Sequence, residues 1–349
     1  MAADPFFAAV WDTTWALAAL SIAALIALFA RRLVIDVLDR RRERRRKVLT
    51  DQIFKYLNNP SDSSLLMPLK TASDQRILLS IASRLLQNVS GDMRERLIGL
   101  LNDTIDFKRF LKQLKTGIAP DRAKIAARLY WADDPAVHAA LREALHDPEP
   151  EVVLAAAGSL VEAGQTIDVK DFAAVCAARG MLANRAVREL FRKLAPANIG
   201  PLVDLLSHDT VEVVILAADA LSRAHDPQVA HVLSALATTH PDADVRAQAV
   251  RSLGIGGHAD AGLAVLDALQ DERWQVRAQA SVAAERLKLA DAVPRLVELL
   301  RDGEWWVQMR AAEALAGLGG AGEAALEALR ADPEVGTLAA VALAERHAA

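Results

Sequence analysis

Three stretches of the sequence decide the fold, because they are copies of one another. They read HPDADVRAQAVRSLG (240–254), QDERWQVRAQASVAAERL (270–287) and RDGEWWVQMRAAEALAGLG (301–319). Their first valines, Val245, Val276 and Val307, are spaced 31 residues apart. Within each copy, apolar residues recur three and four positions apart, which is the spacing of one helical face. A repeat of this length predicts helical units that stack on one another.

The repeat extends in both directions from these copies. Two earlier copies contain Val152 and Val213, which are 61 residues apart and leave room for one diverged copy between them. The diverged copy lies at 184–195. A possible first copy lies at 119–134 and a last copy at 332–347. Second helices run between copies, at 229–237, 261–270 and 292–302. Each unit is therefore a helix, a turn and another helix, and we predict an all-α fold with an α-solenoid over 120–349.

The unit D-P-x-x-x-V-R-x-x-A-x-x-A-L-x-x-L-G resembles HEAT repeats, specifically the short form also seen in phycobilin-lyase-like proteins. This resemblance covers about two thirds of the chain and implies the solenoid fold. The phycobilin-lyase branch would imply handling of a chromophore. Asp271 and Asp302 stand at the second position of two of the copies, and we expect them to cap the helices that follow.

A different pattern precedes the array. The run TTWALAALSIAALIALFA (13–30) has no charge over 18 residues, and 1.5 Å per residue nearly carries it across a hydrocarbon core of ~30 Å. We predict a transmembrane helix over 13–35 after a short extracytoplasmic tail (1–12). Acidic residues precede the run and Arg31 and Arg32 follow it, which favours a retained anchor over a cleaved signal peptide. We predict that this helix lies in the inner (plasma) membrane. The positive-inside rule then places the N-terminus outside and the solenoid in the cytoplasm.

A basic collar follows the apolar run. The stretch RRRERRRK (40–47) lies in a predicted juxtamembrane helix (36–59), and residues 31–55 carry a net charge of +6. Anionic lipid head groups are the nearest partner for such a cluster. The residues predicted to contact them are Arg40, Arg41, Arg42, Arg44, Arg45, Arg46 and Lys47. The alternative is that these cations only set the topology. A hinge near Pro60 and degenerate helical repeats over 60–119, with helices at 73–88, 92–101 and 106–115, complete the predicted organisation.

The sequence contains no recognisable catalytic or metal-binding motif. Its one cysteine, Cys176, excludes a disulfide framework within the chain. The eight histidines mostly fall in predicted turns and form no HExxH spacing. The glycine-rich LGIGGHADAG (253–262) follows a helix rather than a strand, so it is interpreted as a helix stop. We predict that the chain is not an enzyme and has no catalytic residues, cofactor or bound metal.

The best candidate site is a set of tryptophans and arginines at equivalent places in successive copies. Trp and Arg are the residues most enriched in the energetic centres of protein interfaces. The predicted partner-binding residues are Trp274, Arg277, Trp305, Trp306, Arg310 and Arg246. The alternative is structural: the tryptophans pack on a neighbouring turn, and the arginines form salt bridges with the preceding aspartate. In solenoids the second helix of each unit usually lines the concave binding surface.

These features predict a membrane-anchored scaffold that binds a partner protein. Membrane-anchored HEAT proteins of this size resemble accessory subunits of bacterial membrane glycosyltransferases that make polysaccharide, which implies such a synthase as the partner. Two alternatives are a small-ligand or chromophore lyase that uses the concave face and an organiser of anionic lipid. Residues 120–349 carry a net charge of −11, which disfavours nucleic acid as a partner.

Overall fold

The computed structural model describes residues 5–58 and 71–348. All regular structure in this part of the chain is helical, which confirms the predicted all-α class. The chain divides into two units, residues 1–109 and 110–349, each of which is described by itself. Residues 1–4 of the predicted tail and the predicted hinge near Pro60 lie outside the described residues.

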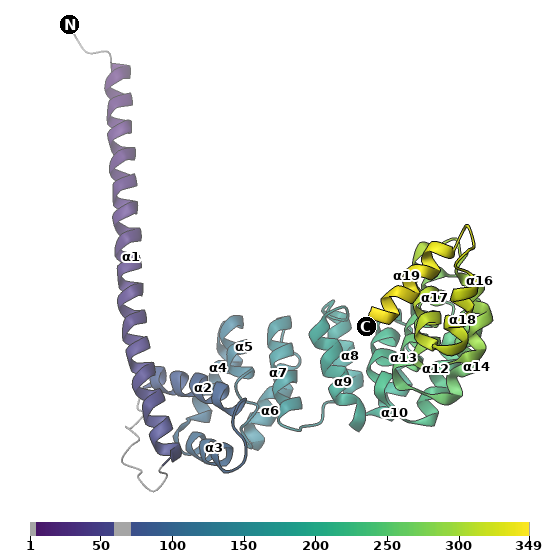
Figure 1. The fold of residues 1–349 in the computed structure, drawn as a ribbon. Helices are drawn as coiled ribbons and strands as arrows, with labels where there is room; N and C mark the ends of the chain where they lie inside the picture. The colour runs from purple at the N-terminus through teal and green to yellow at the C-terminus, as the bar shows by residue number, and fades with distance from the viewer. Residues whose placement is uncertain (1–4, 59–70, 349) are drawn as a thin grey trace. The chain divides into compact units, whose positions relative to one another are not determined.

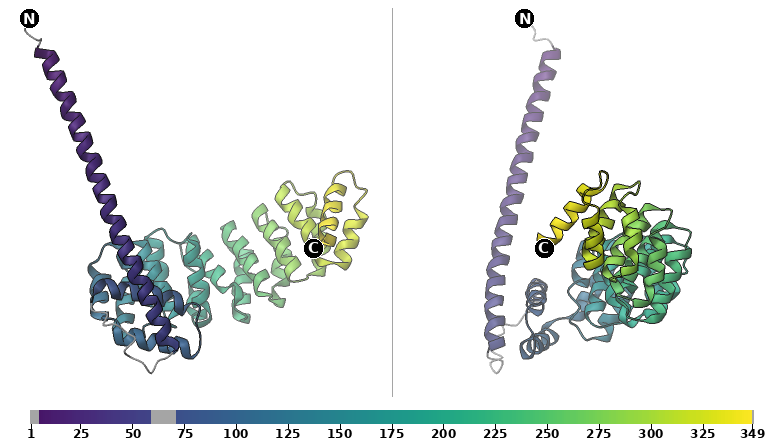
Figure 2. Two further views of the ribbon diagram at one scale, coloured as in Figure 1. Left: turned by 60° about the vertical axis from the view of Figure 1, so that its left-hand side comes forward. Right: turned by 45° about the vertical axis from the view of Figure 1, so that its right-hand side comes forward.

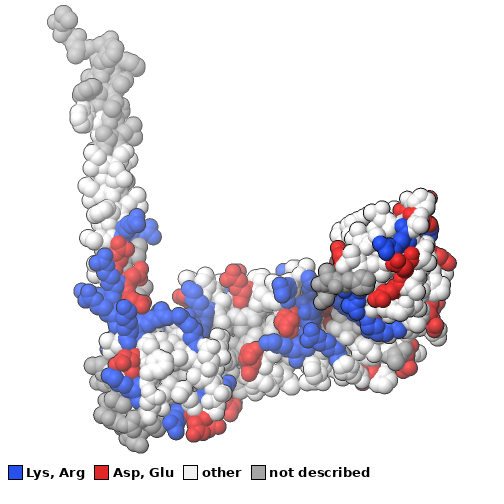
Figure 3. Space-filling model, viewed as in Figure 1, with Lys and Arg blue, Asp and Glu red and all other residues white. Residues whose placement is uncertain are grey.

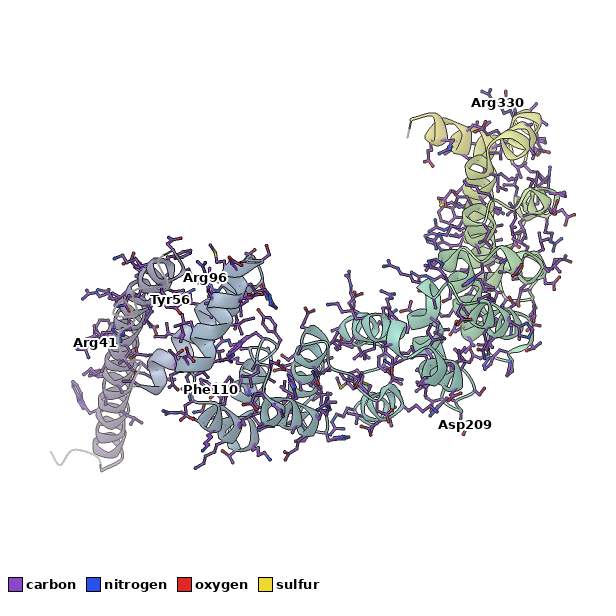
Figure 4. The ribbon with its side chains drawn as sticks, turned by 90° about the horizontal axis from the view of Figure 1, so that it is seen from below. Arg41, Tyr56, Arg96, Phe110, Asp209 and Arg330 are labelled. Atoms are coloured by element: carbon purple, nitrogen blue, oxygen red, sulfur yellow. The ribbon has the colours of Figure 1, made fainter. Side chains whose placement is uncertain are left out.

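The first unit consists of one long helix and two short ones. Helices α1 (Pro5–Asn58), α2 (Ala72–Leu86) and α3 (Asp92–Thr104) contact one another near the end of α1. Figure 4 labels Tyr56 on α1 and Arg96 on α3, and Arg96 donates a hydrogen bond to the carbonyl oxygen of Leu57 at 3.3 Å. Helix α4 (Phe107–Thr116) continues the chain into the second unit.

Helix α1 runs without a break through the predicted apolar segment and the basic collar (Figure 1). Among the residues that the structure describes, no helix is both long enough and apolar enough to cross a membrane. Several large apolar side chains of α1 are nevertheless exposed, among them Leu20, Ile26 and Phe29. Toward its end α1 packs on its neighbours through Leu49 and Ile53, which are one turn apart and buried.

The second unit is built of two layers of helices (Figures 1 and 2). The odd-numbered helices that contact one another in sequence are α5 (Ala119–Ala126), α7 (Pro150–Glu162), α9 (Arg185–Leu194), α11 (Val211–Ala220), α13 (Ala243–Gly256), α15 (Trp274–Arg286), α17 (Trp305–Leu318) and α19 (Gly336–Ala348). The even-numbered helices are α6 (Pro135–Ala144), α8 (Val169–Ala178), α10 (Ile199–Leu205), α12 (Pro227–Thr239), α14 (Gly262–Ala268), α16 (Val293–Leu299) and α18 (Gly320–Ala328). This alternation is the predicted α-solenoid.

The core of the solenoid follows the repeat that was visible in the sequence. The repeated valines Val245, Val276 and Val307 are fully buried. Small residues let successive odd helices approach closely: a Cβ atom added to Gly254 of α13 would lie 2.9 Å from the Cα of Ala283 in α15. Fixed packing at this distance holds α13 and α15 in one mutual arrangement.

The turn aspartates Asp271 and Asp302 bind the backbone of the turn before each helix, and not the first turn of the helix as predicted. Asp271 accepts a hydrogen bond from the backbone N–H of Arg273, the residue directly before α15, and Asp302 does the same for Glu304 before α17. These bonds shape the turn instead of capping the first N–H groups of the helix. The reason is that Asp271 and Asp302 stand two residues before the N-cap residues Arg273 and Glu304, and each carboxylate is also engaged by an arginine of the preceding unit.

Candidate partner-binding surface

A ladder of arginine–aspartate pairs ties successive units of the solenoid together. In each of three pairs, an arginine on an odd helix donates from Nε and Nη2 to both carboxylate oxygens of an aspartate 25 residues later. The pairs are Arg122–Asp147, Arg246–Asp271 and Arg277–Asp302, with donor–acceptor distances of 2.7–2.9 Å. Bidentate pairing of this kind fixes both position and orientation.

Arg246 and Arg277 therefore lie inside the repeat stack and not on an exposed patch, which corrects their predicted placement. The Nη1 group of Arg246 also donates to the carbonyl oxygens of His240 and Pro241, and Arg246 is only 7% exposed. Arg277 makes the equivalent bonds to the carbonyls of the turn before α15. Each guanidinium thus joins its own turn to the aspartate of the following unit, whereas the sequence suggested pairing with the preceding one.

This environment shifts the acidities of the paired aspartates. Burial alone would raise the pKa of Asp302, but the hydrogen bonds from the Arg277 guanidinium and from the backbone N–H of Glu304 outweigh it and hold that pKa below its ordinary value. The pKa of Asp271 is lowered in the same way by Arg246 and Arg273. Both carboxylates remain charged at neutral pH and act as structural anchors.

The tryptophans behave differently from these arginines. Trp305 and Trp306 are 54% and 51% exposed, and their rings meet edge to face with centroids 4.9 Å apart. Trp274 is 36% exposed at the equivalent place on α15. Arg310 is half-buried and pairs with Glu313 on the same helix at 2.7 Å. Of the six residues predicted to bind a partner, the three tryptophans and Arg310 are therefore the ones that remain accessible.

A groove of about 360 Å³ lies beside Trp274 on the odd-numbered layer. Helices α11, α13 and α15 form it, so it is built by the first helix of each unit and not by the second. Its lining comprises Ile215, Asp244, Ala247, Gln248, Arg251, Trp274, Gln275, Ala278 and Gln279. The aliphatic floor and the amide side chains suit a ligand with both apolar and hydrogen-bonding groups.

Most of the groove escaped prediction, although the sequence held a signal for it. Gln248 and Gln279 both stand three residues after a repeated valine, so they lie in register on adjacent helices. Asp244 and Arg251 have no such periodic copy in α15 and could not be singled out. Only the stacking of α13 on α15 brings Trp274 to the same groove.

In the first unit, the basic collar divides into a packed face and an exposed face. Arg45 donates to both carboxylate oxygens of Asp74 on α2 at 2.8 and 3.1 Å, and this hydrogen bond lowers the pKa of Asp74. Arg46 is half-buried and lies 3.9 Å from Glu43. The exposed collar residues are Arg40, Arg41, Arg44 and Lys47, and the side chain of Arg42 lies outside the described residues. Figure 3 shows the basic side chains gathered on this part of α1, and Figure 4 shows Arg41 pointing outward.

Two side chains of types often used in catalysis, Cys176 and His138, are buried. Burial raises the pKa of the Cys176 thiol to about 12, so it is not a nucleophile at neutral pH. His138 lies buried inside α6, away from the turns where most histidines were predicted. Within the described part of the chain, no three His, Cys, Asp or Glu side chains are grouped so that they could hold a metal ion.

Comparison with known proteins agrees with this architecture. Residues 173–254 and 263–345 match the family model for HEAT repeats. The solenoid contains HEAT repeats. No curated protein matches the chain.

Several solved structures are similar over most of the chain. An engineered protein is 19% identical, with 85% of this chain and 99% of that chain covered and a TM-score of 0.38. A Kap121p mutant is 14% identical, with 85% and 41% covered and a TM-score of 0.47. Human deoxyhypusine hydroxylase is 19% identical, with 79% and 98% covered and a TM-score of 0.31. The chain thus spans about two fifths of the Kap121p length.

Proposed function

We propose that this chain is a non-enzymatic scaffold whose HEAT solenoid binds a partner protein and whose first helix holds that partner at a membrane. The observation that carries the proposal is the exposure of Trp274, Trp305 and Trp306 on adjacent odd helices, together with the open groove that Trp274 lines. Exposed tryptophans clustered on a rigid framework are typical of protein interfaces. The ion-pair ladder keeps that framework in register.

The membrane part of the proposal rests on α1. Its uncharged run of 18 residues precedes the basic collar, and Leu20, Ile26 and Phe29 within it are 64–73% exposed. Exposed apolar side chains of this size are stabilised by an apolar environment, and a lipid bilayer supplies one. The collar then lies on the cytoplasmic side with the solenoid.

Anionic lipid is the second partner that we propose, through the exposed collar residues only. Arg40, Arg41, Arg44 and Lys47 are free to reach head groups, whereas Arg45 is engaged with Asp74. Removing the four charges is expected to reduce the anionic lipid that remains bound after purification in detergent, as measured by mass spectrometry. An unchanged amount of bound anionic lipid would show that the basic collar only sets the orientation of the helix in the membrane.

The central test is purification of the full chain from detergent-solubilised membranes, followed by mass spectrometry. A stoichiometric partner protein is expected, and the double change Trp305→Ala and Trp306→Ala should abolish its recovery. The matched control is Leu263→Ala, which truncates another exposed side chain, on α14. Recovery of the unmodified chain alone would contradict the scaffold function.

The class of the partner is a narrower proposal. The resemblance to accessory subunits implies a membrane glycosyltransferase that makes polysaccharide, and its presence in the purified complex would support this. A stoichiometric partner of another class would refute that identity while leaving the scaffold function intact. Co-purification of a tightly bound chromophore would instead support the lyase alternative.

A further inference from the structure

The groove over α13 and α15 has opposite charges at its two ends. Asp244 and Arg251 line it from the same helix, seven residues apart, which is about 10 Å along the helix axis. Both side chains are exposed, and within the described part of the chain neither has an ion-pair partner. The nearby charges of Arg246 and Asp271 are already paired with each other. The groove therefore presents one free negative and one free positive group.

Between these ends the groove offers amides and an aromatic wall. Gln248 projects from α13, and Gln275 and Gln279 project from α15. The Oε1 atom of Gln275 is buried and accepts no hydrogen bond, so turning this amide toward the groove would let it accept an N–H from a ligand and would satisfy that acceptor. Trp274 stands two residues before Val276 and Asp244 one residue before Val245, so both lie in the first turns of their helices, and both line the groove.

An extended polypeptide matches this arrangement. Its backbone presents N–H donors for the amide carbonyls at regular intervals, and it advances about 3.3 Å per residue, so roughly three residues separate the charged ends. Asp244 and Trp274 line the same groove, so a basic side chain bound at Asp244 can also contact the indole ring, which favours cations. Nucleic acid is disfavoured, since residues 120–349 contain 22 basic against 33 acidic side chains.

We infer that the groove binds an extended segment of the partner protein that carries a basic and an acidic side chain three residues apart. The basic side chain lies between Asp244 and Trp274, and the acidic side chain pairs with Arg251. This inference rests on the proposed scaffold function and names the chemistry that the scaffold recognises. The exposed Trp305 and Trp306 on the next odd helix extend the contact beyond the charged segment.

The test uses blocked, fluorescently labelled nine-residue peptides in a Gly/Ser background and the full-length chain in detergent. One probe carries Arg and Glu three residues apart, and the matched probes carry two Arg, two Glu or no charge. Fluorescence anisotropy is expected to show that the wild-type chain binds the Arg/Glu probe most tightly. Each matching charge on a probe should lower its dissociation constant about fivefold relative to the uncharged probe.

Charge reversal then shows whether the groove is the site. Asp244→Arg should shift the preference to the two-Glu probe, and Arg251→Asp should shift it to the two-Arg probe. Both residues are exposed, so the variants are expected to fold, and circular dichroism checks this. Asp244→Asn removes the negative charge without reversing it and is a milder alternative to Asp244→Arg. The same order of preference in all variants, or no binding of any probe, would overturn the inference.

Failure of this inference can be told apart from failure of the scaffold function. If the natural partner still co-purifies with a chain that carries both Asp244→Arg and Arg251→Asp, and is lost with Trp305→Ala and Trp306→Ala, the scaffold function holds and the groove proposal fails. If the charge-reversed chain also loses the partner, the groove proposal is supported.

Discussion

Replacing Asp302 with alanine is expected to destabilise the solenoid by about 3 kcal/mol. The change removes two charged hydrogen bonds from Arg277, both 2.7 Å long, and the bond from the Glu304 N–H at 3.0 Å. Charge-assisted bonds contribute about 1.5–3 kcal/mol each, and breaking a buried pair costs about 3–5 kcal/mol. The lower end applies, because the Arg277 side chain keeps 16% exposure and its bonds to two carbonyls.

Two further variants separate the charge from the turn. Asp302→Asn keeps an acceptor for the Glu304 N–H and is expected to cost about half as much. The double change Arg277→Met and Asp302→Ala should cost less than the two single changes added together, because no unpaired guanidinium remains. Urea unfolding of the full chain, followed by circular dichroism, measures these differences.

The location of the effect provides the sharpest check. Since repeats contact mainly their neighbours, Asp302→Ala should increase hydrogen exchange in α15 and α17 and leave α5 and α7 unchanged. A loss below about 0.5 kcal/mol, or an equal loss of protection throughout the array, would refute the view that the ladder couples adjacent units.

The same ion pair predicts a dependence on pH. The pKa of Asp302 is lower in the folded chain than in the unfolded one, so its contribution is fully present above the unfolded value of about 3.9. That contribution disappears as the pH falls through the lower, folded value. The stability difference between the wild-type chain and Asp302→Ala should therefore stay constant from pH 8 to 5 and shrink below about pH 4. A difference that persists unchanged below this range would show that charge is not its source.

Three more outcomes are expected. Gly254→Ala should lower the free energy of unfolding in urea by about 1–3 kcal/mol, because its Cβ would press on Ala283. Gly158→Ala, with free space around it, should instead stabilise α7 by about 0.5–1 kcal/mol. Equal effects of the two changes would contradict the close approach of α13 and α15. Cys176 should resist alkylation by iodoacetamide at pH 8 in the folded chain and react in denaturant, and rapid labelling before denaturation would contradict its burial. Trp305→Ala should change the unfolding free energy by less than about 1 kcal/mol, and a loss of 3 kcal/mol or more would identify this side chain as core.

The periodic features of this chain could be determined from its sequence alone. The 31-residue spacing of Val245, Val276 and Val307 predicted helical units with a common core, and all three side chains are buried. This works because burial on one face of a helix depends on residues three and four apart, which the sequence displays directly. The tryptophans were singled out for the same reason, since they occupy equivalent places before those valines, and they are exposed.

The partners of the charged residues were decided only by the tertiary structure. Arg246 was predicted to lie on a surface patch, yet it is bound to Asp271 of the following unit, and the groove beside it is lined by helices from three successive units. The position of one unit against the next depends on local packing, such as the space left by Gly254 against Ala283. Periodicity shows which residues face inward, but the stacking of units determines which side chains meet and which charges, such as Asp244 and Arg251, have no ion-pair partner among the described residues.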